Sequence, residues 1–340
     1  MFIFVKKSDM YFSLIIPVFN RPDEIDELLE SLLHQTYDDN FEIVIIEDGS
    51  SVDCKEVIKK YTSLSITYHY KSNSGPGDSR NFGMRVAKGD YFIVLDSDCI
   101  IPPDYLEKIH RSLENEYVDC FGGPDKALDS FSDIQKAINF TMTSFITTGG
   151  VRGGSEKIGK FQPRSFNMGI SKHAFEVSHG FGNIHPGEDP DLSIRLWKAG
   201  FKTKLISEAY VYHKRRIDWN KFYIQVNKFG LARPILNKWY PEYTKITFWF
   251  PTLFLLGFLL SLVCIFFNFY YLIVLYLVYF LLLGLLSTIE NKSVRIGYYS
   301  IIAVIIQFYG YGKGFLNAYY QIHILNKNPQ TVFPKMFFRK

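Results

Sequence analysis

Residues 91–99 read YFIVLDSDC, an apolar run that ends in two aspartates one residue apart. An apolar run of this length predicts a strand that is buried on both faces. In extended backbone Asp96 and Asp98 would point to the same side. A divalent cation would relieve their repulsion there, and carboxylate oxygens suit Mg²⁺ or Mn²⁺. An isolated D-x-D is also common as a solvated turn, so the surrounding chain has to decide between the two readings.

Strands and helices alternate through the first half of the chain. Such alternation predicts an α/β fold with a mostly parallel central sheet between helices, and ligands bind at the carboxyl edge of such sheets. Polar residues follow three predicted strands, so we expect them to form one site: Asn20, Glu47 with Asp48, and Asp96 with Asp98. The strands are expected at 13–18, 41–46, 65–70, 91–95 and 204–213, and the helices at 22–35, 53–61, 79–87, 102–115 and 188–199.

The last hundred residues have a membrane composition. No charged residue occurs from 246 to 287, and the segments 246–267 and 270–287 are each long enough to cross a bilayer as a helical hairpin. Lysines and arginines flank both ends, which predicts that both ends are cytosolic. A third apolar segment, 296–315, would either cross as well or lie in the interface. The alternative for the whole region is a buried soluble bundle. We expect a catalytic domain over 1–240 and a membrane domain over 241–340.

Composition excludes several classes of function. The net charge of +4 comes from scattered basic residues, without the clustered patch of a nucleic-acid-binding protein. The four cysteines share no metal-binding spacing and are expected to be reduced, as in the cytosol. Residues 1–12 lack the features of a signal peptide, so we expect the polar part to stay on the side where it is made. The basic run 214–216 would contact phosphate or anionic lipid, or form a solvated face.

Four stretches in the same order resemble a known family. They are SLIIPVFNRPDEI (13–25), IVIIEDGSSVD (43–53), NSGPGDSRNFGMRVAKGDYFIVLDSDCIIP (73–102) and NIHPGEDPDLSIRLWKAGFK (183–202). Together they resemble the inverting glycosyltransferases of family 2, which have the GT-A fold. The resemblance covers residues 12–215. It implies transfer of a sugar from a nucleotide-sugar donor with the help of Mg²⁺ or Mn²⁺.

The resemblance implies roles for residues on the donor side. Asp48 would accept a hydrogen bond from the base, or be a simple turn residue. Arg80 would approach the diphosphate, or hold Asp96. Asp98 would bind the metal directly. The remaining donor-side positions are Pro17, Val18 and Phe19 at the nucleoside, Gly75 and Ser97 at the nucleotide, and Asp96 near ribose and metal.

On the acceptor side, the resemblance makes Asp189 the general base, with Glu188 beside it. A base is needed because the acceptor hydroxyl must lose its proton as it attacks the anomeric carbon. One base and one metal give a single displacement with inversion. Acids at a helix start also serve as caps. Asn167 and Met168 would face the acceptor. His213 would complete the metal or diphosphate site, or be structural.

The chain departs from one pattern of the family. Processive membrane synthases carry a Gln-x-x-Arg-Trp motif, whereas residues 225–236 read QVNKFGLARPIL. We therefore expect one sugar, most commonly from a UDP donor, to be added to a hydroxyl of a membrane-associated glycan or lipid-linked acceptor at the cytosolic face of the inner membrane. Loops 121–125 and 147–159, the latter expected to be mobile, would select the donor. Two alternatives are a non-catalytic nucleotide-sugar-binding scaffold and a nucleotidyltransferase, which normally has a basic, glycine-rich loop after the first strand.

Overall fold

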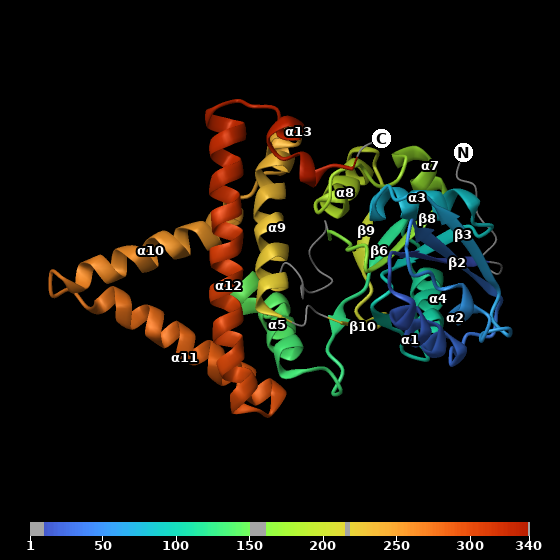
Figure 1. Ribbon diagram of the computed structural model, residues 1–340, viewed down its shortest axis with the longest axis horizontal. Helices are drawn as coiled ribbons and strands as arrows, with labels where there is room; N and C mark the ends of the chain where they lie inside the picture. Colours follow the sequence, from blue (N-terminus) through green and yellow to red (C-terminus); the bar gives the residue numbers. More distant parts are fainter. Residues whose placement is uncertain (1–9, 150–160, 215–217, 339–340) are drawn as a thin grey trace.

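The chain folds around a seven-stranded mixed sheet, with a helical region to one side (Figure 1). The computed structural model describes residues 10–149, 161–214 and 218–338. Four strands at one end of the sheet are parallel, in the order β3-β2-β1-β4, and β8 is antiparallel to both of its neighbours, β4 and β6. The predicted α/β class with a mostly parallel sheet is confirmed. The strands are β1 (Phe12–Val18), β2 (Phe41–Asp48), β3 (Ile66–Lys71), β4 (Tyr91–Leu95), β6 (Cys120–Gly122), β8 (Asn167–Ser171) and β9 (Thr203–Leu205).

Helices bury both faces of the sheet, which explains the continuous apolar strands. Alternate residues of β1 belong to two separate cores: Leu14 and Ile16 pack toward α1 and α4, whereas Ile15 packs toward α3, α7 and α8. In α1 the apolar residues recur at helical spacing and are buried against the first face. The helices are α1 (Pro22–Leu33), α2 (Lys55–Ile58), α3 (Pro76–Val86), α4 (Tyr105–Asn115), α7 (Lys172–Ser178) and α8 (Glu188–Lys198).

A small second sheet lies beside the carboxyl end of β4. Its strand order is β5 (Cys99–Ile100), β10 (Val211–His213), β7 (Asp125–Lys126). The prediction of one continuous strand over 204–213 is wrong, because the chain turns near Ser207. The first part, β9, pairs with β6 of the large sheet, and the second part, β10, pairs with β5. This division places His213 directly opposite Cys99.

The helical region combines segments from the middle and the end of the chain. The long helices α9 and α12 lie side by side, and α5 also packs on α12. The predicted domain boundary at 240 stays a prediction, since α5 and α9 precede it in sequence yet contact α12. The elements are α5 (Asp133–Thr143), α6 (Phe145–Thr148), α9 (Trp219–Trp239), η1 (Pro241–Tyr243), η2 (Ile246–Trp249), α10 (Phe250–Ile265), α11 (Tyr271–Asn291), α12 (Val294–Tyr319), η3 (Tyr320–Ile324), α13 (Pro329–Val332) and η4 (Pro334–Met336).

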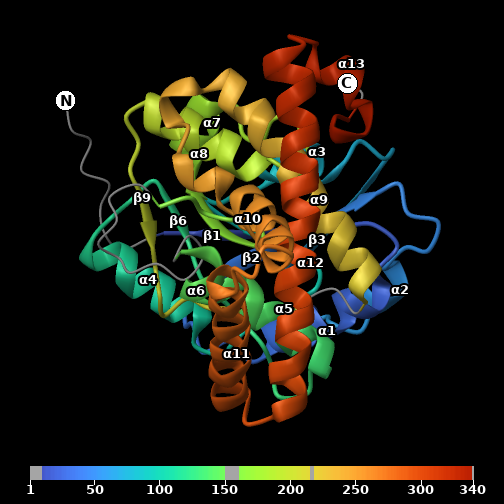
Figure 2. The same ribbon diagram turned by 90° about the vertical axis from the view of Figure 1, so that its left-hand side faces the viewer.

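Helices α10 and α11 form a hairpin that projects away from the rest of the molecule (Figures 1 and 2). By length and composition, two segments among the described residues could cross a membrane: Ile246–Ile265, with a mean hydropathy of 2.3, and Tyr271–Asn291, with 2.6. Few of their residues are buried. The third apolar segment forms most of α12, whose small residues pack against α9 and α11. This third segment is not among the described segments that are apolar enough to cross a membrane.

Candidate active site

The two aspartates that follow β4 lie in a turn. The amide of Cys99 donates a hydrogen bond of 3.2 Å to the carbonyl of Asp96, so residues 96–98 form a turn rather than an extended strand. The expectation of an extended backbone through Asp98 is therefore wrong: the chain must reverse here to begin β5. The two carboxylates consequently have different partners, Arg80 for Asp96 and His213 for Asp98.

Asp98, Cys99 and His213 form the candidate metal centre. One ligand atom from each lies within 4.8 Å of the others, and Nε2 of His213 lies 3.1 Å from Oδ1 of Asp98. The ring of His213 stacks on Phe166 with centroids 4.7 Å apart. Carboxylate oxygen and imidazole nitrogen together suit Mn²⁺, whereas a thiol is a poor ligand for a hard cation. Cys99 instead directs its thiol toward the carbonyl of Phe166. The donor set of Asp98 and His213 therefore fits a divalent cation.

Arg80 links the end of β4 to the start of α8. It projects from α3, is almost fully buried, and contacts Asp96 at 2.7 Å and Glu188 at 3.2 Å. Burial by itself would lower the pKa of Arg80, but the two carboxylates outweigh burial and raise it. Of the two roles expected for Arg80, the structure shows the contact with Asp96.

Glu188 and Asp189 begin α8 but lie in different electrostatic environments. Burial would raise the pKa of Glu188, but His185, whose Nδ1 lies 2.8 Å away, and Arg80 outweigh it and lower this pKa. Burial and the neighbouring charge of Glu188 raise the pKa of Asp189 to about 6. One carboxylate oxygen of Asp189 has no hydrogen-bond partner among the described residues. Asp189 is therefore the carboxylate in this pair with a free acceptor atom and a raised proton affinity, two properties of a general base.

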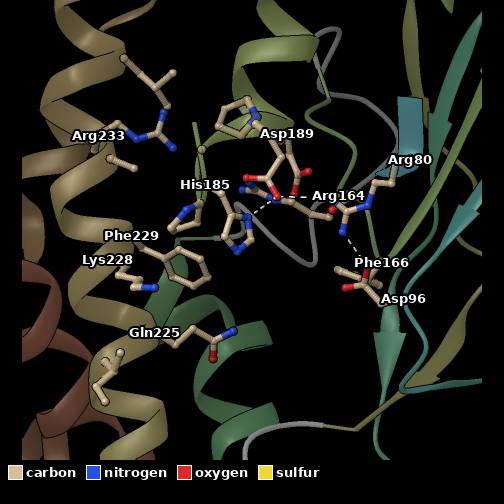
Figure 3. Close-up of a pocket in the computed structure, with 18 of the residues that line it drawn as sticks. Arg80, Asp96, Arg164, Phe166, His185, Asp189, Gln225, Lys228, Phe229 and Arg233 are labelled. Atoms are coloured by element: carbon tan, nitrogen blue, oxygen red, sulfur yellow. Dashed lines mark hydrogen bonds and ion pairs between the residues drawn. The ribbon is translucent and has the colours of Figure 1, made fainter. Parts of the chain in front are cut away.

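A cavity of about 490 Å³ joins these groups, and it lies between the sheet domain and α9. Figure 3 shows Arg80 and Asp96 on one side of this cavity and α9 on the other, with Asp189 between them. The α9 wall consists of residues at helical spacing: Gln225, Lys228, Phe229, Ala232, Arg233 and Leu236. The sequence reasoning missed this wall, together with Arg164 and His185. The spacing along 225–236 could have revealed a mixed polar and apolar helix face, but not what it faces.

The remaining donor-side residues lie around the carboxyl ends of β1 and β2. Asp48 accepts hydrogen bonds from Lys71 and from the amides of Ser74 and Gly75. Phe19 is 50% exposed beyond β1. The side chain of Val18 is buried in the core with α1, so the expectation that it lines a pocket is wrong for the side chain. Pro17 is partly buried in β1, and the hydroxyl of Ser97 donates to Glu24 at 2.8 Å.

Asn167 and Met168 do not face an acceptor. Both are fully buried in β8, which is paired on both edges. The amide side chain of Asn167 accepts from the hydroxyl of Tyr105 and donates to the carbonyl of Ala209, while Met168 belongs to the core under α8. That expectation is wrong because a central strand directs its side chains into the two packed layers. Loop residues 150–159 and the basic residues Arg215 and Arg216 lie outside the described residues.

Comparisons with known proteins agree with this fold. Residues 13–178 match Glycosyl transferase family 2. An uncharacterized glycosyltransferase of Rickettsia bellii is 41% identical over 112 residues, which cover 32% of this chain and 16% of the relative. A poly(ribitol-phosphate) beta-glucosyltransferase of Bacillus spizizenii is 34% identical over 113 residues, covering 32% of this chain and 18% of the relative. The chain thus spans less than a fifth of the length of these two relatives.

A solved structure shares the fold. The mannosyltransferase PcManGT from Pyrobaculum calidifontis, in complex with GDP-Man and Mn²⁺, superimposes with a TM-score of 0.53 at 14% identity, covering 67% of this chain and 64% of that chain. The family match ends before Glu188, Asp189 and His213, so it carries no information on these three. The expected resemblance is confirmed over residues 13–178, which match glycosyl transferase family 2, and the sheet domain has the GT-A fold.

Proposed function

We propose that this protein is a metal-dependent inverting glycosyltransferase. It moves one sugar from a nucleotide-sugar donor, with a UDP-sugar as the first candidate, to a hydroxyl of a membrane-associated glycan or lipid-linked acceptor. One observation carries the proposal: Asp189, with its raised pKa and an unbonded carboxylate oxygen, lines the same cavity as Arg80, Asp96 and His213.

The donor would bind along the carboxyl edge of the sheet. Asp98 and His213 would hold Mg²⁺ or Mn²⁺, which supplies positive charge to offset the charge that develops on the leaving diphosphate. The similarity of the fold to a mannosyltransferase in complex with GDP-Man and Mn²⁺ supports this assignment. Asp48, Gly75 and Phe19 would surround the nucleoside.

In the mechanism, Asp189 accepts the proton from the acceptor hydroxyl as the hydroxyl oxygen bonds to the anomeric carbon. The bond from that carbon to the diphosphate oxygen breaks in the same step, so the configuration inverts. Arg80 holds Asp96 and Glu188 in place, and His185 and Arg80 together lower the pKa of Glu188 and keep it ionised. Since Glu188 stays ionised, its charge also maintains the basicity of Asp189.

The hairpin of α10 and α11 would anchor the enzyme in the inner membrane, with the sheet domain on the cytosolic side. The two apolar helices, in which few residues are buried, support this placement. The basic residues Lys238, Lys245, Lys292 and Arg295 flank the hairpin in the sequence, which the positive-inside rule associates with cytosolic ends. Without the Gln-x-x-Arg-Trp motif, we propose transfer of a single sugar.

The proposal is tested with purified full-length protein and a panel of UDP-, GDP- and dTDP-sugars, each with Mn²⁺, with Mg²⁺ and with chelator. We expect metal-dependent binding of one donor class and release of a nucleoside diphosphate. Asp98→Ala should abolish metal-dependent donor binding. Donor binding of normal strength in the presence of chelator would contradict the metal assignment.

The same experiment separates the alternatives. A nucleotidyltransferase would release pyrophosphate rather than a nucleoside diphosphate. A scaffold would bind a nucleotide sugar but show no turnover with any donor, either alone or with membrane extracts as a source of acceptor. The intact acidic groups at Asp98 and Asp189 favour the transferase over the scaffold.

A further inference from the structure

A second cavity opens beside the active-site cavity, and we propose that it binds the lipid part of the acceptor. We call it the apolar groove; it has a volume of about 650 Å³. The proposed occupant is a lipid-linked saccharide whose apolar chain lies in the groove, whose phosphate is bound by Arg164 and Arg233, and whose sugar hydroxyl reaches Asp189. This inference rests on the proposed function, because it specifies the acceptor of the same reaction.

The groove is apolar along its length and charged at one end. Its walls come from α5, α6, α9, η2, the first turn of α10, and α12, with lining residues that include Met142, Phe145, Ile146, Phe250 and Leu253. Arg164 and Arg233 are the two charged side chains among the described residues that line it. Such a site suits a long apolar molecule with an anionic group at one end.

The charged end is also the junction with the active site. Arg164, Phe229 and Arg233 line both cavities. Figure 3 shows Arg233 on α9, with Arg164 close to Asp189. The order along the connected space is therefore the apolar groove, the two arginines, the proposed base, and then Asp96 and His213. An amphiphile with a chain, a phosphate and a sugar has its parts in the same order.

The positive charges of Arg164 and Arg233 are not balanced by ion pairs among the described residues. Neither forms an ion pair with a carboxylate of the described residues; Arg233 lies over the ring of Phe248 at 4.0 Å instead. Burial lowers the pKa of both groups. At Arg233 the phenol of Tyr311 offsets part of this effect, whereas the charge of Arg164 lowers the pKa further. Asp189 and Glu188 offset part of this effect at Arg164. A phosphate between two guanidinium groups would form charge-assisted hydrogen bonds with both and remove their repulsion.

The position of the groove favours a lipid over a soluble apolar ligand. Its wall includes Ile246, Phe250 and Leu253, which belong to the first of the two segments that could cross a membrane. These side chains, and Phe145 on the opposite wall, remain exposed. Figure 2 looks onto this side of the molecule, with the hairpin in front of α5 and α12. A chain leaving the bilayer beside α10 would therefore enter the groove directly.

The test measures binding to full-length protein in a non-ionic maltoside detergent. The probes are farnesyl phosphate, the uncharged alcohol farnesol, and inorganic phosphate. We expect farnesyl phosphate to bind at least tenfold more tightly than either of the others, since only it fills both the groove and the arginine pair. Equal binding of farnesol would overturn the role of the arginines, and equal binding of inorganic phosphate would overturn the role of the groove.

Variants locate the site. Arg233→Gln should weaken farnesyl phosphate binding at least tenfold, Arg233→Lys should weaken it less, and Arg295→Gln, far from the groove on α12, should not change it. Thermal unfolding checks that each variant is folded. Unchanged affinity in Arg233→Gln would overturn the proposal, and Arg233→Lys keeps the test valid if the glutamine variant does not fold.

Donor binding in the same preparation separates this proposal from the proposed function. Metal-dependent nucleotide-sugar binding without farnesyl phosphate binding would refute the groove assignment and leave the glycosyltransferase intact. Farnesyl phosphate binding without any nucleotide-sugar binding would refute the proposed function. A folded Arg233→Gln variant that loses the lipid phosphate but keeps the donor would support both.

Discussion

Polar side chains at the sheet edge form a connected series. His185 contacts Glu188, and Arg80 pairs with both Glu188 and Asp96, so the series runs from the α8 loop to the end of β4. Asp189 lies next to these residues, and its burial and the negative charge of Glu188 raise its pKa. Two adjacent carboxylates with opposite pKa shifts are how a fold separates a structural acid from a reactive one.

At this scale the sequence predicted some pairs and missed others. The contact of Arg80 with Asp96 and a place for His213 at the metal site were each one of two roles that the resemblance to the family left open. His185, Arg164 and Arg233 were missed. Each of them reaches the cavity from a different element, and no local pattern marks such a convergence.

The pH dependence of turnover should report Asp189. Its carboxylate form accepts the proton, so activity is lost as pH falls through the raised pKa of about 6. We expect kcat at saturating donor to fall about tenfold per pH unit below that value, since the fraction of Asp189 in the carboxylate form falls in that proportion. Asp189→Asn should lower kcat by about 10²- to 10⁴-fold, remove the acidic limb and leave donor affinity unchanged. An acidic limb that persists in Asp189→Asn would assign the titration to another group.

Arg80 should contribute strongly to stability. Arg80→Gln leaves the buried carboxylate of Glu188 with one fewer partner, and breaking a buried pair costs about 3–5 kcal/mol. Arg85→Gln, an exposed position on the same helix, is the matched control and should cost less than about 1 kcal/mol. Chemical denaturation of the two variants measures the difference. Equal stabilities would show that Arg80 is dispensable for the fold.

At the scale of elements, glycines allow α9 and α12 to approach each other closely. Gly230 of α9 lies against the backbone of Tyr311, and Gly310 and Gly314 of α12 lie against α9. The glycine-aromatic run at 309–314 was visible in the sequence as an unusual feature of an apolar segment. Its partner was not, because nothing in residues 219–239 indicates which helix they contact.

Gly230→Ala should therefore separate the two helices. An added Cβ would overlap the carbonyl oxygen of Tyr311, a backbone atom that cannot move alone. Overpacking of this kind costs about 1–3 kcal/mol, and it should also weaken donor or acceptor binding, because α9 forms one wall of the cavity. Asn220→Ala, on an exposed position of α9, is the control. A Gly230→Ala variant as stable as the wild type would mean that the interface tolerates a wider spacing.

The C-terminal segment illustrates a contact that sequence patterns do not encode. The amide of His185 donates to the carbonyl of Met336, and the ring of Phe338 covers Gly75. Residues from the end of the chain thus lie against both the α8 loop and the start of α3. Short-range spacing predicted the strands and most helices of the first half, but it contains no information on pairs this far apart.

At the scale of the whole molecule, the chain combines an α/β domain with a projecting hairpin of two apolar helices. The hairpin was predicted from the absence of charge between 246 and 287, and the two helices occur there. α11, with 21 residues, is about 31 Å long, which matches the hydrocarbon thickness of a bilayer. The bundle alternative fits poorly, since few residues of either helix are buried.

The membrane topology can be tested by labelling single cysteines with an impermeant maleimide. Cys264 is replaced by alanine, while the other three native cysteines are buried and should react slowly. Asn268→Cys lies at the turn of the hairpin and Lys292→Cys at its base. If the hairpin crosses the bilayer, the two positions are labelled from opposite sides of sealed vesicles. Lys59→Cys, exposed on the sheet domain, should be labelled from the same side as Lys292→Cys. Labelling of Asn268→Cys from that side as well would show that the hairpin lies along the surface.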